Sequence, residues 1–181
     1  MCSPYSPIIT DATKDVFNDY INSLDIPQID YFAIGVQNSV TKQSISLMSL
    51  PEWQKVFVAN QFAEFDPVRR ASLNTQRNII PFNEMDFCDN FGKEIMKQRK
   101  LIGISDGIIF MKRFKKYNYI MTLGTAFSRF EAYEFIKRYY SQIQFLQKDL
   151  ISLVEKDVRG FISPYLLTYP ESIIQSSSDA K

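Results

Sequence analysis

Trp53 and Asp66 are the two residues whose types and spacing point to small-molecule chemistry. Trp53, the only tryptophan of the chain, offers an indole N–H donor on a large apolar ring, and Asp66 offers a carboxylate acceptor. A small-molecule pocket needs a few such polar functions to fix the orientation of its ligand. Spacing alone favours the structural interpretation, with Trp53 as a core residue and Asp66 as a helix cap.

The sequence around these two residues predicts how they are positioned. Pro51 suits the first position of a helix, and Trp53 and Phe57 then recur at helical spacing on its inner face. Because proline disfavours the α conformation in the residue before it, the pair Asp66-Pro67 predicts a break, with Asp66 as the N-cap of the next helix. The ring and the carboxylate are therefore expected on the walls of one space.

Patterns along the rest of the chain alternate between helix and strand. In the helix expected over 89–101, Phe91, Ile95 and Met96 form the apolar face, and Arg99 is expected among the exposed basic residues. Asp106-Gly107 is interpreted as a β-bulge. Further helices are predicted over about 11–24 and 128–156, and strands over 31–37, 43–48, 78–82, 104–111 and 117–127. This order predicts an α+β fold with an antiparallel, about five-stranded sheet sandwiched between helical layers.

Composition excludes several function classes. The chain has 181 residues, enough for one domain with a core, and its formal charge of +1 provides no electrostatic footprint for DNA. The absence of histidine excludes histidine-activated nucleophiles and histidine metal sites, so Cys88 has no histidine to activate it. Glu84, Asp86 and Asp89 are interpreted as a solvated acidic helix start. We expect no enzyme activity, no metal and no cofactor.

The first residues contain no signal peptide, and no apolar run is long enough to span a membrane. Cys2 and Cys88 do not make a disulfide framework. The sequence therefore predicts a cytoplasmic protein without a membrane partner.

A family resemblance extends this interpretation over roughly residues 11–152. The chain resembles the ligand-binding domain of LuxR-type quorum-sensing transcriptional regulators, which bind acyl-homoserine lactones. The residues that carry the resemblance are Trp53, Phe57, Asp66-Pro67-Val68, Phe82 and Gly103-Ile104-Ser105-Asp106-Gly107. It implies a five-stranded antiparallel sheet between helical layers and a receptor for an acyl-homoserine lactone or similar acylated molecule. In such a site Trp53 would donate to the ring carbonyl and Asp66 would accept from the amide N–H.

The sequence departs from the family pattern at several ligand positions. Ser49 and Leu50 occupy the turn where the family has a tyrosine, Asn83 stands where a second tryptophan is usual, and Phe57 replaces a common tyrosine. Thr122 lies near a hydroxyl-bearing position of the family and could compensate. The expected ligand-binding set is Trp53, Asp66, Phe57, Thr122, Phe82, Asn83 and Ser49.

The family's helix-turn-helix DNA-binding domain does not follow in this chain. We expect a receptor-like domain over 1–158, a C-terminal segment and mobile tail over 159–181, and no direct DNA binding by this chain alone. The expected partner is a second copy or a LuxR-type regulator, with ligand binding linked to folding and dimerisation. The alternative is a ligand-independent module that pairs with or inhibits full-length regulators, and both a domain of a longer protein and a stand-alone protein remain open.

Overall fold

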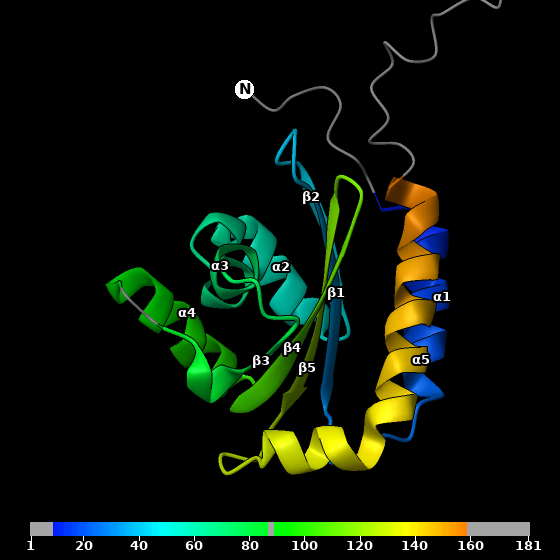
Figure 1. Ribbon diagram of the computed structural model, residues 1–181. Helices are drawn as coiled ribbons and strands as arrows, with labels where there is room; N and C mark the ends of the chain where they lie inside the picture. Colours follow the sequence, from blue (N-terminus) through cyan, green and yellow to red (C-terminus); the bar gives the residue numbers. More distant parts are fainter. Residues whose placement is uncertain (1–8, 87–88, 159–181) are drawn as a thin grey trace, which may run out of the picture.

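A five-stranded antiparallel sheet forms the middle layer of the computed structural model, which describes residues 9–86 and 89–158. The α+β fold with helical layers predicted from the sequence is confirmed. In spatial order the strands are β2 (Ser44–Met48), β1 (Tyr31–Asn38), β5 (Tyr117–Thr125), β4 (Asp106–Phe114) and β3 (Ile79–Pro81). One face carries α1 (Asp11–Asn22) and α5 (Ala132–Val158), and the other carries α2 (Pro51–Ala59), the short helix η1 (Phe62–Glu64), α3 (Pro67–Asn74), η2 (Phe82–Glu84) and α4 (Asn90–Leu101) (Figure 1).

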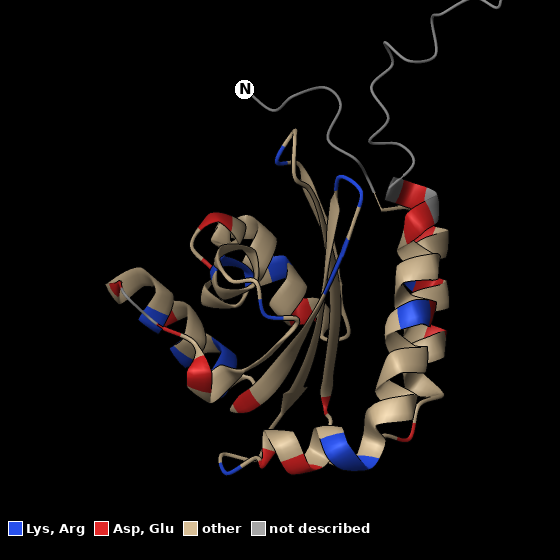
Figure 2. Cartoon of the chain, viewed as in Figure 1, with Lys and Arg blue, Asp and Glu red and all other residues tan. Residues whose placement is uncertain are grey.

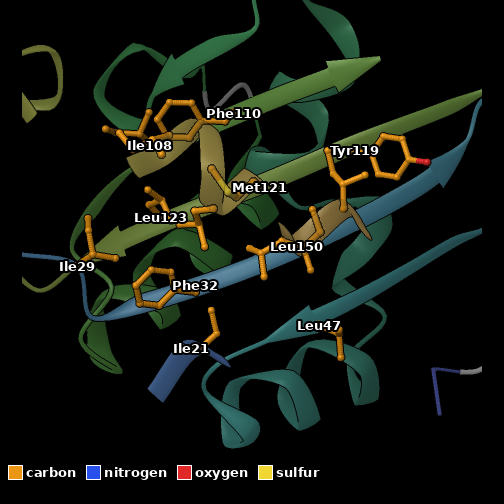
Figure 3. Close-up of a cluster of buried hydrophobic side chains, with 14 of the residues drawn as sticks. Ile21, Ile29, Phe32, Leu47, Ile108, Phe110, Tyr119, Met121, Leu123 and Leu150 are labelled. Atoms are coloured by element: carbon orange, nitrogen blue, oxygen red, sulfur yellow. The ribbon is translucent and has the colours of Figure 1, made fainter. Parts of the chain in front are cut away.

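Both faces of the sheet are buried because helices cover each of them, and successive side chains of each strand point to opposite sides. In β1, Phe32 and Ile34 belong to the core under α1 and α5, whereas Tyr31 and Ala33 belong to the core under α2, α3 and α4. Figure 3 shows the first core, where strand residues such as Phe32, Met121 and Leu123 lie beside Ile21 of α1 and Leu150 of α5. The strands consequently read as nearly continuous apolar runs.

The long helix α5 begins later than the sequence predicts and is kinked. It starts at Ala132 instead of residues 128–129, and Tyr139 has non-helical angles (φ −111°, ψ 17°). Figure 1 shows that the helix changes direction between the end of the sheet and the sheet face. After the kink Ile143, Leu146 and Leu150 are fully buried, as their spacing predicts.

The bulge expected at Asp106-Gly107 is wrong. Gly107 pairs with Gly124 in an uninterrupted β4–β5 ladder. A Cβ atom at position 107 would lie 2.5 Å from the backbone oxygen of Leu123, so the glycine permits a close strand approach instead of an extra residue. Cys88 and the segment 159–181 lie outside the described residues.

Charged residues of both signs are spread over the helices and turns, with basic residues gathered at the β4–β5 turn (Figure 2). Within residues 9–86 and 89–158, no helix is long and apolar enough to cross a membrane. No group of acidic or cysteine side chains in the same ranges could hold a metal ion.

Tyr20 joins α1 to α5 and should make stability fall at alkaline pH. Its hydroxyl donates to Asp149 Oδ2 at 2.7 Å, and burial and this carboxylate raise the pKa of Tyr20 from 10.0 to about 12. A raised pKa in the folded state stabilises the fold fully below the unfolded value, and this contribution is lost as the pH rises through about 12. We expect the urea midpoint of Tyr20→Phe to fall less steeply than that of the wild type above pH 10. Tyr140→Phe, an exposed control on α5, should keep the wild-type profile; identical profiles for Tyr20→Phe and the wild type would contradict the prediction.

Candidate functional site

A cavity of about 690 Å³ lies between the sheet and the layer of α2, η1 and α3. The sheet side is formed by residues of β1, β2 and β5, including Ala33, Met48 and Ile120. The helical side includes Phe57 of α2. Arg99 reaches the cavity from the neighbouring helix α4. A mostly apolar cavity of this size with a few polar groups is typical of small-molecule sites.

Asp66 is placed at the cavity by the break between α2 and α3. Gln61 adopts the left-handed conformation (φ 54°) after α2, one turn of 3₁₀ helix follows, and Asp66 is extended (φ −62°, ψ 118°). Its carboxylate accepts from the backbone N–H of Val68 at 3.2 Å, and Pro67 occupies the first helical position. The predicted N-cap is confirmed, and it fixes the carboxylate in a buried position.

Asp66 also forms a two-point ion pair with Arg99. Arg99 Nη1 lies 2.5 Å from Asp66 Oδ1, and Nη2 lies 3.0 Å from Oδ2. Arg99 is 3% exposed and Asp66 4%. Burial alone would lower the pKa of Arg99, but the attraction and hydrogen bonds of Asp66 outweigh it and raise that pKa. The expectation that Arg99 is exposed is therefore wrong, because a carboxylate 33 residues away in sequence compensates its charge.

Trp53 and Tyr31 surround this pair. The Arg99 guanidinium carbon lies 5.3 Å from the centre of the Trp53 ring, a cation–π arrangement. Burial raises the pKa of the Tyr31 hydroxyl, while Arg99 and the nearby Trp53 indole oppose part of that rise. The indole contact falls short of hydrogen-bonding geometry, and Trp53 Nε1 is buried without a hydrogen-bond partner among the described residues. Tyr31, Asp66 and Arg99 thus line the cavity, and Trp53 lies behind Arg99.

Arg69 of α3 is the second arginine that lines the cavity. Its Nη1 donates to the backbone oxygen of Ala63 at 2.5 Å, while Nε is buried and lacks a partner within the described part of the chain. Burial lowers the pKa of Arg69, although Asp66 and the exposed Glu64 act in the opposite direction. Its positive charge is thus only partly compensated.

The residues predicted to bind ligand fall into three groups. Asp66, Phe57 and Thr122 line the cavity. Trp53 is 2% exposed and contacts Arg99 behind the cavity wall, and Phe82 is buried in the same core. The other two lie away from the cavity lining: Ser49 Oγ accepts from the backbone N–H of Phe32 at 2.9 Å, and Asn83 is exposed.

Sequence reasoning missed three polar residues of the site: Tyr31, Arg69 and Arg99. A signal for Arg99 was present, since it lies four residues after Ile95, which is fully buried on the same face of α4. Phe91, predicted to lie on the apolar face of this helix, is 45% exposed. For Tyr31, the alternation of side chains along β1 predicts the sheet face on which it lies. It does not predict that a cavity lies on that face.

Comparison with known proteins identifies the fold. Residues 10–148 match the sequence model of the autoinducer binding domain. Among solved structures, the chain is similar to SdiA in complex with octanoyl-rac-glycerol (TM-score 0.57, 14% identity, 82% of this chain and 68% of that chain). It is also similar to the N-acylhomoserine lactone dependent LuxR family transcription factor CepR2 from Burkholderia cenocepacia (TM-score 0.51, 13% identity, 76% and 77%) and to E. coli SdiA1-171 in solution (0.52, 15%, 83% and 82%). No curated protein sequence matches the chain. At these identities the structural likeness concerns the fold alone.

Proposed function

This chain belongs to the autoinducer binding domain family, and we propose that its cavity binds a small molecule with an acyl chain. The observation that carries the proposal is the cavity of about 690 Å³ against β1, β2 and β5, whose lining combines apolar side chains with the polar groups of Tyr31, Asp66, Arg69 and Arg99. Such a lining suits an amphipathic ligand, whose chain is buried while its head group meets these polar groups. The similar SdiA structure holds octanoyl-rac-glycerol, which supports an acyl ligand for this fold.

Ligand binding should raise the melting temperature. A ligand that binds only the folded state adds about 2.7 kcal/mol at a hundredfold excess over Kd. For a chain of this size that corresponds to a rise of roughly 5–10 °C. Melting curves with fatty acids, monoacylglycerols and acyl-homoserine lactones, together with native mass spectrometry of the purified protein, measure the effect.

Gly35→Leu is the matched variant for this experiment. Gly35 lines the cavity, and a Cβ atom there would meet only ordinary contacts at 3.8 Å or more, so a leucine side chain can enter the cavity without straining the backbone. It should abolish the ligand-induced rise while the protein stays folded. Val40→Leu, at an exposed hairpin position, should retain the full rise. If no acyl compound raises the melting temperature of the wild type and none co-purifies, the proposed function is wrong.

A second candidate function is a ligand-independent interaction module, and the Asp66–Arg99 pair favours it. The pair already supplies the buried carboxylate with a partner, so the site does not need a ligand to compensate its charge. Exposed rings on α5 offer a contact surface; Tyr133, Tyr140 and Phe145 are 57%, 54% and 67% exposed. The partner would be a second copy or a relative with the same fold.

Tyr140→Glu should reduce self-association through this part of α5. A charge placed in an apolar contact loses its hydration, so the dimer fraction at tens of micromolar protein should fall at least severalfold. Sedimentation velocity measures the fraction. Phe114→Glu replaces an equally exposed ring on β4 and should leave it unchanged. A wild-type protein that sediments as a monomer, both alone and mixed with a relative, would contradict the prediction.

A further inference from the structure

The groups around the Asp66–Arg99 pair offer more hydrogen-bond donors than acceptors to a ligand. Asp66 is the acceptor that sequence reasoning assigned to an amide N–H of the ligand. In the structure its Oδ1 accepts from Val68 N and Arg99 Nη1, and its Oδ2 accepts from Arg99 Nη2. A carboxylate has about four acceptor positions, so most of this capacity is already used inside the protein.

The buried side-chain polar atoms without partners are all donors. Within residues 9–86 and 89–158 they are Trp53 Nε1, Arg69 Nε and Arg99 Nε. An indole or guanidinium N–H can only donate, and a buried donor without a partner is costly. Trp53 and Arg99 contact each other, and Arg69 and Arg99 both line the cavity. A ligand atom that completes this site must therefore be an acceptor.

The charges point in the same direction. Asp66 compensates Arg99, but among the described residues no ion pair joins a carboxylate to Arg69. Glu64, which also lines the cavity, is exposed and acts on Arg69 through solvent. Arg69 is instead anchored to the backbone oxygen of Ala63, which holds the guanidinium in place. Lys14, which also lines the cavity, pairs with Asp11, so among the described residues Arg69 is the lining cation that no carboxylate joins in an ion pair.

We propose that the cavity selects an acyl anion, a fatty-acid-type carboxylate, and that Arg69 and Arg99 recognise its head group while Asp66 serves to orient Arg99. The inference rests on the proposed function, because it concerns the head group of the same acyl ligand. The carboxylate accepts from the arginine N–H groups, with a small shift of either side chain, and its chain lies along Ala33, Met48, Phe57 and Ile120. An amide N–H contributes little here, because Asp66 is occupied by Arg99.

A ligand series on the wild-type protein tests this assignment. The probes are dodecanoate below its micelle concentration, methyl dodecanoate, and N-dodecanoyl-homoserine lactone together with its O-acyl ester analogue. Isothermal titration gives Kd, and the emission of Trp53, the only tryptophan, reports occupancy of the site. Dodecanoate should bind at least roughly tenfold more tightly than its methyl ester, as hydrogen bonds to charged groups do. The lactone and its ester analogue should bind within about threefold of each other, whereas a site that accepts the amide N–H would separate them by roughly fivefold or more.

Arg69→Gln is the variant that assigns the charge, and Arg70→Gln is its matched control. Arg70 is the next residue of α3 and pairs with Asp89 away from the cavity. Arg69→Gln should remove the preference for dodecanoate over the methyl ester, Arg69→Lys should restore part of it, and Arg70→Gln should keep it. Arg99→Lys tests the second arginine while leaving Asp66 a cationic partner.

The outcomes separate the two proposals. If the neutral lactone binds at least as tightly as dodecanoate, or if Arg69→Gln weakens all acyl compounds equally, the head-group inference is wrong and the proposed function stands. If no acyl compound binds the wild type, the proposed function fails and takes the inference with it.

Discussion

Asp66→Ala should lower the free energy of unfolding by about 3–5 kcal/mol, because it leaves the Arg99 guanidinium charged and buried without its partner. Arg99 is 3% exposed, so water cannot replace the two hydrogen bonds that the carboxylate supplies. If Asp66 were only an N-cap, as the sequence permits, the same substitution would cost only about 1 kcal/mol. Urea unfolding at neutral pH measures the difference.

Two comparisons isolate the ion pair from the cap. Thr10 caps α1 through Oγ1, which accepts from Thr13 N at 3.2 Å, so Thr10→Ala should cost about 1 kcal/mol. The double variant Asp66→Asn with Arg99→Met keeps the cap and removes both charges, and it should recover most of the stability that Asp66→Ala loses. A loss of about 1 kcal/mol for Asp66→Ala, equal to that of Thr10→Ala, would show that the pair does not stabilise the protein in solution.

Asp66 and Arg99 also show where sequence reasoning succeeds and where it stops. The cap at Asp66 is a local feature, set by the proline that follows it, and it could be predicted from adjacent residues. The spacing from Ile95 places Arg99 on the inner face of α4, but the carboxylate that allows its burial lies 33 residues away, and no local pattern contains it. Without a known partner, an arginine among three lysines on a helix is interpreted as exposed.

The strands could be predicted because their signal lies in adjacent residues, whereas the partner of Arg99 is distant in sequence. Apolar runs of β-branched and aromatic residues separated by turns identify the strands from local sequence, and short connections make β1–β2 and β4–β5 antiparallel neighbours. The pairing of β1 with β5 joins residues far apart in sequence, and the sequence analysis predicted no strand order for the sheet. The kink at Tyr139 has no local proline or glycine signal.

Ile108→Ala and Ile109→Ala should each lower the free energy of unfolding by about 2–5 kcal/mol, although the two side chains point to opposite faces of β4. Both are 0% exposed, Ile108 in the core under α1 and α5 and Ile109 in the core under α2, α3 and α4. The two residues are both isoleucines at adjacent positions of one strand, so the change in β-propensity is nearly the same for both substitutions. Any difference between their losses of stability therefore reflects side-chain packing. Val58→Ala, 65% exposed on α2, should cost less than about 1 kcal/mol and serves as the control.

The comparison decides whether the layer that covers the cavity is a packed core. If α2, α3 and α4 lay loosely on the sheet, Ile109→Ala would cost as little as the control while Ile108→Ala kept its full effect. That result would contradict the structure on the cavity side. Equal large losses, measured by urea unfolding with an unchanged m-value, are expected instead, because the apolar area that each isoleucine removes from water is the same on both faces.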